Sequence, residues 1–214
     1  YGTVEMYCVS LSRIGGSQSI DFTALSALCS RIVPSGALRV LNLAHNQIAG
    51  VDSVGGGERK AAGAEELLRV LRSDLCVLEE LDLSGNLLSE SDGHALLEAA
   101  TRPSARSGQT CAVQRLKLHS WTIPVQLLAE GGTNPLEFAR QEICPLDANL
   151  LAGALRHQQS LQPSGIDLSG NPLGSEGALS IARAVADRST SGKTTTTSGG
   201  GGGKKVIASS SSAS

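Results

Sequence analysis

The sequence predicts an α/β fold built from repeated units, with a curved parallel β-sheet on the inside and helices on the outside. Two observations carry this prediction. A leucine template, L-x-x-L-x-L-x-x-N-x-L, recurs along the 214 residues, and an apolar stretch with helical spacing follows each copy. Each unit would be a short strand, a turn and a helix. About five such units would stack to close one core, because a single unit cannot bury its apolar face alone.

Three copies of the template are clear. Residues 38–48 read LRVLNLAHNQI and residues 78–88 read LEELDLSGNLL, so both fill every position. A third copy, residues 163–173, lacks only the first leucine, which is Pro163. Two weaker copies begin at Val4 and Val113. The residues at the asparagine position of the five copies are Ser12, Asn46, Asn86, Trp121 and Asn171.

A predicted helix follows each copy. In the last one, Leu179, Ala182 and Val185 trace one face at helical spacing. The predicted helices span residues 19–33, 61–74, 92–101, 146–159 and 175–188.

The asparagine position has a physical reason. Where the chain turns away from the sheet, an inward-pointing amide satisfies backbone groups that would otherwise be buried without a partner. Asn46, Asn86 and Asn171 are therefore predicted to form an internal ladder. Indole only donates, so Trp121 lacks the acceptor that this position needs. Its ring either fills space in a distorted repeat or is an exposed aromatic anchor for a partner.

This pattern resembles that of leucine-rich-repeat proteins of the ribonuclease-inhibitor-like subtype, in which a full helix follows each strand. The stretch NPLGSEGALSIARAV carries the resemblance most clearly, with Asn171, Gly174 and Gly177 at the positions that mark the family. The resemblance covers roughly residues 4 to 188. The repeats here are longer than those of the family, and the excess falls in inserts, of which residues 124–145 are one. The resemblance implies a leucine-rich-repeat solenoid that serves as a binding scaffold.

The domain organisation follows from the same pattern. Residues 1–189 are predicted to form one array of about five irregular repeats. Residues 190–214 are rich in Ser, Thr and Gly and are predicted to be a disordered tail, because they bury too little apolar surface to become ordered. A flexible linker, a phosphorylated segment and an electrostatic tether are the alternatives for its role. Because the chain begins at Tyr1 rather than Met, we expect a fragment or a processed product.

Composition and charge exclude several classes of protein. The formal net charge is -2, which lacks the basic excess typical of nucleic-acid-binding proteins. No run of about 18 apolar residues is present, so no membrane span is expected. The five cysteines are odd in number and form no C-x-x-C pair, which favours free thiols in a reducing, cytoplasmic location.

The sequence contains no recognisable catalytic motif. The stretch DRSTSGKT, residues 187–194, lacks the first glycine of a phosphate-binding loop, because Asp187 stands in that position. The four histidines are scattered along the chain without metal-ligand spacing, and no G-x-S-x-G elbow is present. We therefore expect no enzyme activity, no cofactor, no metal and no small-molecule substrate.

A strip of charged residues is the predicted binding site. Between the buried leucines, alternate template positions point away from the core on the concave face of the sheet. With strands about 4.8 Å apart, Arg115 is expected beside Glu80. Lys117 is expected between Asp82 and Asp167. Exposed ion pairs of this kind contribute little to stability, which leaves the strip free for recognition. The predicted partner-binding residues are Glu80, Asp82, Arg115, Lys117 and Asp167.

The leading functional prediction is therefore a non-catalytic scaffold that binds another protein of unknown identity. A regulator of a small GTPase is the alternative, because GTPase-activating proteins for Ran are built from similar repeats with helices.

Overall fold

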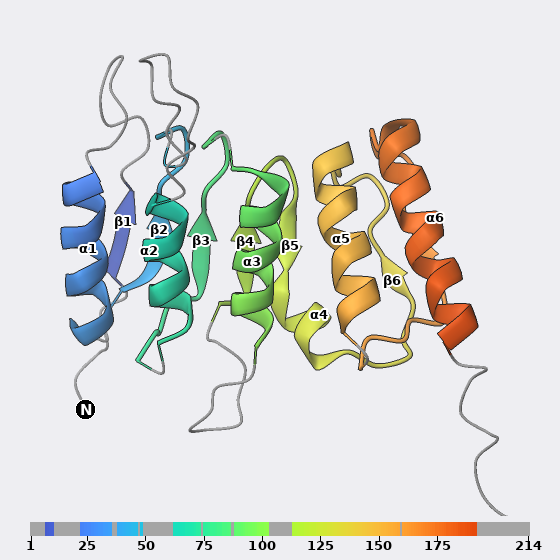
Figure 1. Cartoon of the computed structure of the whole chain (residues 1–214), viewed down its shortest axis with the longest axis horizontal. Coiled ribbons are helices and arrows are strands. Elements are labelled where there is room, and N and C mark those ends of the chain that lie inside the picture. The colour runs from blue at the N-terminus through green and yellow to red at the C-terminus, as the bar shows by residue number, and fades with distance from the viewer. Residues whose placement is uncertain are drawn as a thin grey trace, which may run out of the picture.

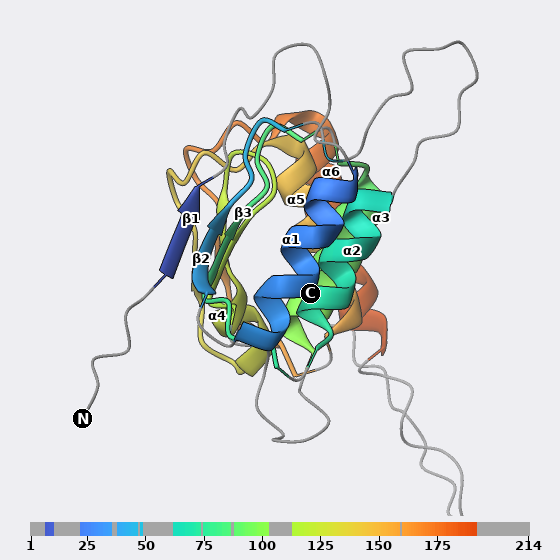
Figure 2. The same ribbon diagram turned by 90° about the vertical axis from the view of Figure 1, so that its left-hand side faces the viewer.

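The chain folds into a layer of helices packed on a layer of strands. The computed structural model describes residues 7–10, 22–35, 38–46, 48, 62–73, 75–86, 88–102, 113–158 and 160–191. Within these residues the longer helices lie side by side in chain order along the molecule (Figure 1). Seen from the end, the strands lie on one side and these helices on the other (Figure 2). The predicted α/β arrangement of helices and parallel strands is confirmed.

The strands form two sheets. They are β1 (Tyr7–Ser10), β2 (Leu38–Asn42), β3 (Glu80–Asp82), β4 (Arg115–Lys117), β5 (Thr122–Pro124), β6 (Leu136–Glu137) and β7 (Ile166–Asp167). The first sheet has the order β1-β2-β3-β4-β5, and the second pairs β6 with β7. All neighbours are parallel except β4 and β5, which are antiparallel.

Five of the described helices coincide with predicted ones to within about three residues at each end. The helices are α1 (Phe22–Ser35), α2 (Ala62–Leu71), α3 (Glu90–Thr101), α4 (Val125–Glu130), α5 (Pro145–His157) and α6 (Gly174–Ser191). The short α4 was not predicted. Among these helices, none combines the length and apolar character needed to cross a bilayer. Residues 192–214, most of the predicted tail, lie outside the described residues.

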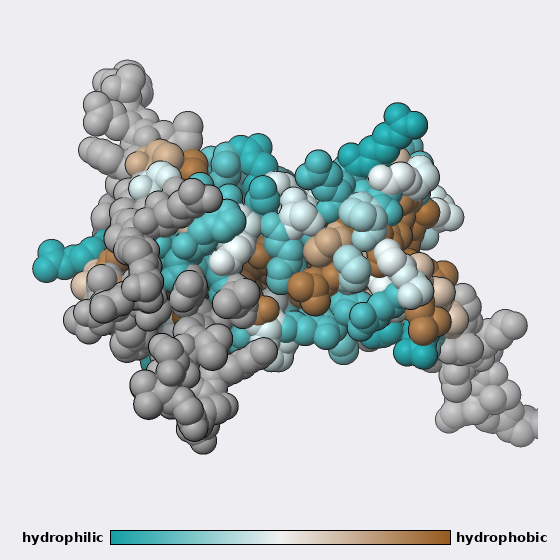
Figure 3. Space-filling model, turned by 90° about the horizontal axis from the view of Figure 1, so that it is seen from above, coloured by the Kyte–Doolittle hydropathy of each residue, from teal (hydrophilic) through white to brown (hydrophobic). Residues whose placement is uncertain are grey.

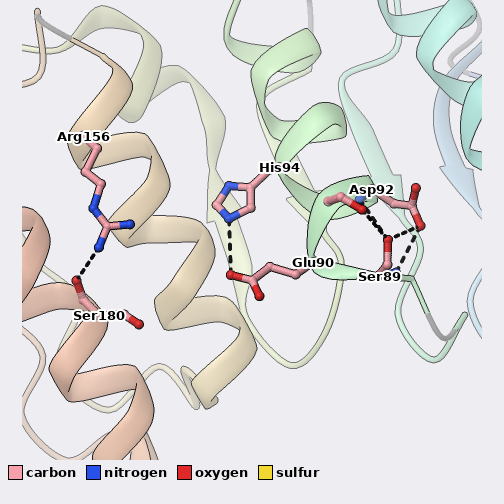
Figure 4. Close-up of polar contacts among 7 residues, drawn as sticks. Ser89, Glu90, Asp92, His94, Arg156 and Ser180 are labelled. Carbon is pink, nitrogen blue, oxygen red and sulfur yellow. Dashed lines mark hydrogen bonds and ion pairs between the residues drawn. The ribbon is translucent and has the colours of Figure 1, made fainter.

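Local side chains fix where helices begin and how they meet. At the start of α3, the Ser89 hydroxyl accepts the backbone N–H of Asp92 at 3.1 Å, and Asp92 Oδ2 accepts the backbone N–H of Ser89 at 3.1 Å (Figure 4). This reciprocal capping box satisfies two donors that the first helical turn leaves without partners. Further along the helix layer, the Arg156 guanidinium of α5 donates to the carbonyl of Ser180 in α6 at 3.4 Å (Figure 4).

The template leucines build the core between the two layers. Leu41, Leu81 and Leu116 lie opposite one another in register on β2, β3 and β4. Each is at most 1% exposed. The period of two along a strand turns every second side chain inward, so these leucines meet the buried helix residues, among them Leu67 and Leu96.

The corner after each strand requires a left-handed backbone. Gly85 and Gly170 have φ values of 71° and 72°, and they occupy the same place in the two DLSGN segments. His45 and Arg140 take this conformation with φ values of 60° and 56°. A residue with a Cβ rarely adopts it, which explains why two of the corners use glycine. The recurrence of the corner near Arg140 also identifies a unit that the leucine template missed.

The predicted asparagine ladder is present in two sections. Asn86 Oδ1 accepts the backbone N–H groups of Asn46 and Ile48 at 2.8 and 3.2 Å. Its Nδ2 donates to the carbonyls of Leu43 and Leu83, both at 2.8 Å. One amide therefore satisfies backbone groups of its own unit and of the preceding unit.

Asn171 repeats this arrangement in the second sheet. Its Oδ1 accepts the N–H groups of Gln141 and Ile143 at 2.8 and 3.1 Å. Its Nδ2 donates to the carbonyls of Phe138 and Leu168 at 2.7 and 2.9 Å. The residues around 136–143 therefore behave as a unit of the array.

Two expectations about the register were wrong. The stretch 124–145, expected as an insert, contains β6, which lies between the units of Trp121 and Asn171. The sequence concealed it because Phe138 replaces a template leucine and Gln141 the asparagine. The first template copy, which begins at Val4, is also shifted along its neighbouring strand. Cys8 and Asn42 hold the same template position and should lie opposite one another, but Cys8 lies opposite Val40.

Trp121, just before β5, packs against Phe138, just after β6. It is 1% exposed, and its ring meets that of Phe138 edge to face with centroids 5.0 Å apart. Its Nε1 donates to Gln141 Oε1 at 2.8 Å. The space-filling alternative is therefore confirmed, and the exposed-anchor alternative is wrong.

Asp147 supplies the acceptor that Trp121 lacks. This carboxylate is 0% exposed. Its Oδ2 accepts the backbone N–H of Trp121 at 3.1 Å and the Ser120 hydroxyl at 2.9 Å. The Asp147 carboxylate of α5 thus accepts the backbone N–H of the turn at Trp121, as the Asn86 side chain accepts that of the turn at Asn46.

Candidate functional site

The side of the five-stranded sheet turned away from the helices contains an open hollow. We call this side the outer sheet face. The hollow has a volume of about 260 Å³ and extends across β2, β3, β4 and β5. Its lining residues are Val40, Leu41, Asn42, Glu80, Leu81, Asp82, Arg115, Lys117 and Thr122. Four of the five predicted site residues therefore meet in one depression.

Register alignment brings these side chains together. Val40, Glu80 and Arg115 lie opposite one another on β2, β3 and β4. One step further along the same face, Asn42, Asp82 and Lys117 form a second row. Because strands present alternate residues to the same face, both rows project away from the buried leucines.

The first row contains the predicted ion pair. The Arg115 guanidinium donates to Glu80 Oε1. The side chains remain 57% and 37% exposed, so water screens their attraction and the pair contributes little to folding stability. Both groups are thus available at the surface to a docking partner.

The second row differs from the prediction. Asp82 Oδ1 accepts the backbone N–H of Ser84 at 2.9 Å and its hydroxyl at 2.7 Å. Asn42 Oδ1 accepts the N–H of Ala44 in the same way, at 2.9 Å. A short acidic or amide side chain at this position therefore closes the turn after the strand. This structural role was missed at the sequence level, although the recurring D/N-x-S/A spacing signals it.

Lys117 is the exception in its row. Its carbon chain cannot close such a turn, and the described residues provide no hydrogen bond or ion pair to its ammonium group. In register it lies between Asp82 on β3 and Thr122 on β5. Of the other charged side chains that line the hollow, Glu80, Asp82 and Arg115 each make a hydrogen bond. The Lys117 ammonium is therefore the charged group there that is most available to a partner.

Asp167 does not belong to this site. It lies on β7, whose neighbour is Glu137 on β6, and β5 occupies the place beside Lys117. The predicted position of Lys117 between two aspartates is therefore wrong. Asp167 instead closes its own turn through Ser169, whose N–H lies 2.9 Å from Oδ1. The hydrogen bonds from the Ser169 backbone and side chain hold the pKa of Asp167 below its ordinary value.

The described groups with a shifted pKa, Cys29, His119 and Asp167, are not among the residues that line the hollow. Burial lowers the pKa of His119, and the nearby Asp147 carboxylate partly opposes this effect. In the part of the chain that the structure describes, no group of three or more His, Cys, Asp or Glu side chains is arranged to hold a metal ion. What the outer sheet face offers to a partner is the hollow itself, with the charged and hydrogen-bonding side chains of Glu80, Arg115 and Lys117 along it.

Three segments of the chain match family models for leucine-rich repeats. Residues 38–51 and 166–182 match one model described as Leucine Rich repeat, and residues 77–97 match another described as Leucine Rich Repeat. Comparison with curated proteins gives no match. The matched segments contain β2, β3 and β7 with their asparagine corners. Together, these matches support a leucine-rich-repeat protein, a class whose repeats typically mediate protein–protein contacts.

Proposed function

We propose that this chain is a non-catalytic scaffold that binds another protein through the outer sheet face. The observation that carries the proposal is the 260 Å³ hollow across four strands, lined by Glu80, Asp82, Arg115 and Lys117. We further propose the ribonuclease-inhibitor-like subtype and a curved solenoid, with the sheet on the concave side. The long helices that follow β1, β2, β3, β6 and β7 support that subtype.

The chemistry of the hollow favours a partner with mixed polar and charged groups. Arg115 and Glu80 neutralise one another, while the Lys117 ammonium is free to meet a carboxylate or carbonyl of the partner. Thr122 adds a hydroxyl, and the exposed edge of Val40 adds apolar contact. Charged contacts across an interface steer the encounter and determine its specificity.

The proposal excludes nucleic acid, membrane and small-molecule partners, and it places the protein in the cytoplasm. Cysteine usage supports this location, because Cys8, Cys29, Cys76 and Cys144 are free thiols. Fractionation of the source cells tests it. Recovery in the secreted fraction would overturn the cytoplasmic location.

The binding proposal is tested by affinity purification with the native chain and with the variant Arg115→Glu/Lys117→Glu. The matched control is Arg72→Glu/Arg102→Glu, which makes the same change in net charge at exposed positions outside the hollow. A partner that the native chain and the control retain, and the first variant loses, supports the proposal. Equal retention by all three chains overturns it.

Regulation of a small GTPase is tested separately. GTP hydrolysis by purified Ran is measured with and without the chain. An increase would replace the scaffold proposal with the regulatory one, and an unchanged rate is the expected result.

A further inference from the structure

Within the part of the chain that the structure describes, no helix or strand covers the end formed by β7 and α6, and apolar side chains are exposed there. Leu179 and Val185 on α6 are 48% and 45% exposed. The template residues Ile166, Leu168 and Leu173 are only partly buried there. Figure 3 shows apolar atoms at this end. The equivalent leucines of inner units are buried, such as Leu81 at 1% exposed, because a following unit covers them.

Among the described strands, β7 has no neighbour on one of its two edges. Its described partner is β6 on one side, so its other row of backbone N–H and C=O groups faces outward. An exposed strand edge is a template for pairing with another strand. We call the surface made by this edge and by Leu179, Ala182 and Val185 of α6 the end face.

The asparagine ladder stops at the end face. Within the array, the Asn46 N–H donates to the Asn86 side chain of the following unit at 2.8 Å. Likewise, the Gln141 N–H donates to the Asn171 side chain at 2.8 Å. In the described part of the chain, no side chain accepts the N–H of Asn171 itself. The Leu173 N–H donates to the Asn171 carbonyl at 2.9 Å, so the Asn171 N–H is the one ladder donor left without a described acceptor at the end face.

Charge along α6 indicates which partner fits. Glu176 and Arg183 are exposed and seven residues apart, which is two helical turns. Neither has an ion-pair partner among the described residues. When two copies of α6 pack antiparallel, Glu176 of each copy meets Arg183 of the other, and Leu179 lies near the centre of the contact. A parallel arrangement would not bring these opposite charges together.

We propose that two copies of this chain associate through their end faces as a closed two-fold dimer. β7 pairs with its copy antiparallel, and α6 packs antiparallel on its copy. A two-fold contact uses the same patch on both subunits and therefore stops at two, whereas a head-to-tail contact would continue into a filament. This interface is independent of the outer sheet face, which remains open on each subunit.

The dimer is tested by sedimentation velocity of the full chain over a concentration series. We expect a monomer–dimer equilibrium for the native chain. Leu179→Arg places a charge at the centre of the contact in both subunits, so the dissociation constant should rise at least roughly thirtyfold, as for a central anchor. Leu75→Arg is the matched control, since Leu75 is 56% exposed and lies outside the end face.

A charge exchange tests the antiparallel geometry. Glu176→Arg and Arg183→Glu alone should each weaken the dimer about tenfold through like-charge contacts, and the double variant should restore it. A native chain that remains monomeric overturns the proposal, as does a chain that forms filaments. A dimer that Leu179→Arg leaves intact, or a double variant no better than the single ones, overturns it as well.

Discussion

The side-chain oxygen of Asn86 accepts the backbone N–H of Asn46 at 2.8 Å, across 40 residues of sequence. The same amide also reaches Ile48, Leu43 and Leu83. This contact makes the corner of one unit depend on the side chain of the next. The two units are thereby fixed in register, and the charged rows of the outer sheet face are aligned with them.

Replacing Asn86 should therefore destabilise the array strongly. Asn86→Leu leaves several buried backbone groups without partners, and we expect the free energy of unfolding to fall by about 3 kcal/mol. Urea denaturation followed by circular dichroism measures the loss. The control Asn42→Ala removes one partly buried hydrogen bond and should cost about 1 kcal/mol or less. Equal losses in the two variants would contradict the ladder.

Glycine at the corner should also be required. A Cβ at Gly85 would lie 2.2 Å from His45 Nδ1, and the φ of 71° is unfavourable for other residues. Gly85→Ala should lower the free energy of unfolding by roughly 1–2 kcal/mol. Gly165→Ala is the matched control, because no atom beyond the neighbouring residues of the chain lies within 4 Å of its Cβ position. Thermal denaturation of both variants provides the test, and an equal decrease of the melting temperature in the two would refute this explanation.

The Arg115–Glu80 pair should matter for binding and not for folding. Arg115→Ala removes a pair in which both side chains are exposed, so the free energy of unfolding should change by less than about 1 kcal/mol. Urea midpoints of the native chain and the variant provide the test. A loss several times larger would mean that the pair is structural, and would remove the reason for treating it as a recognition element.

Cys29 should be chemically inert in the folded chain. Burial, reinforced by the Glu66 carboxylate, raises the pKa of its thiol to about 11, and the thiolate is the reactive form. Cys8 is exposed. With a disulfide reagent at pH 8, the number of fast-reacting thiols should fall by one in Cys8→Ser and stay unchanged in Cys29→Ala. The opposite pattern would show that Cys29 is accessible.

The same pKa predicts a loss of stability in alkali. An unfolded chain ionises this thiol near its ordinary pKa of 9, while the folded chain retains the proton to about 11. The contribution of the protonated Cys29 thiol to the free energy of unfolding is therefore complete below pH 9 and is lost as the pH rises towards 11. The pH dependence of the urea midpoint in this window should be smaller in Cys29→Ala. An unchanged slope would contradict the burial of the thiol.

The strong units could be predicted from the sequence because burial dictates their residue types. Leu41, Leu81 and Leu116 fill the core, and Asn86 accepts backbone N–H groups of the turn. These requirements restrict the residue types at those positions, so the template can be recognised in the sequence. The row of Glu80 and Arg115 followed directly from that register.

The remaining features depended on tertiary context. Strand β5 is three residues long and reverses direction after Trp121, and so short a segment has no periodicity to detect. Strand β6 has two residues, and its corner uses Arg140 and Gln141 in place of glycine and asparagine. Asp167 was misplaced beside Lys117 because these two strands were not recognised.

Photocrosslinking tests most directly whether the outer sheet face binds a protein. A photoreactive residue is placed at position 122 on the hollow, or at position 72 outside it, and the chain is irradiated in extract from the source cells. We predict a crosslinked partner from position 122, lost when Arg115→Glu/Lys117→Glu is added, and none from position 72. The same partner crosslinked from position 72 and absent from position 122 would place the binding site on another face.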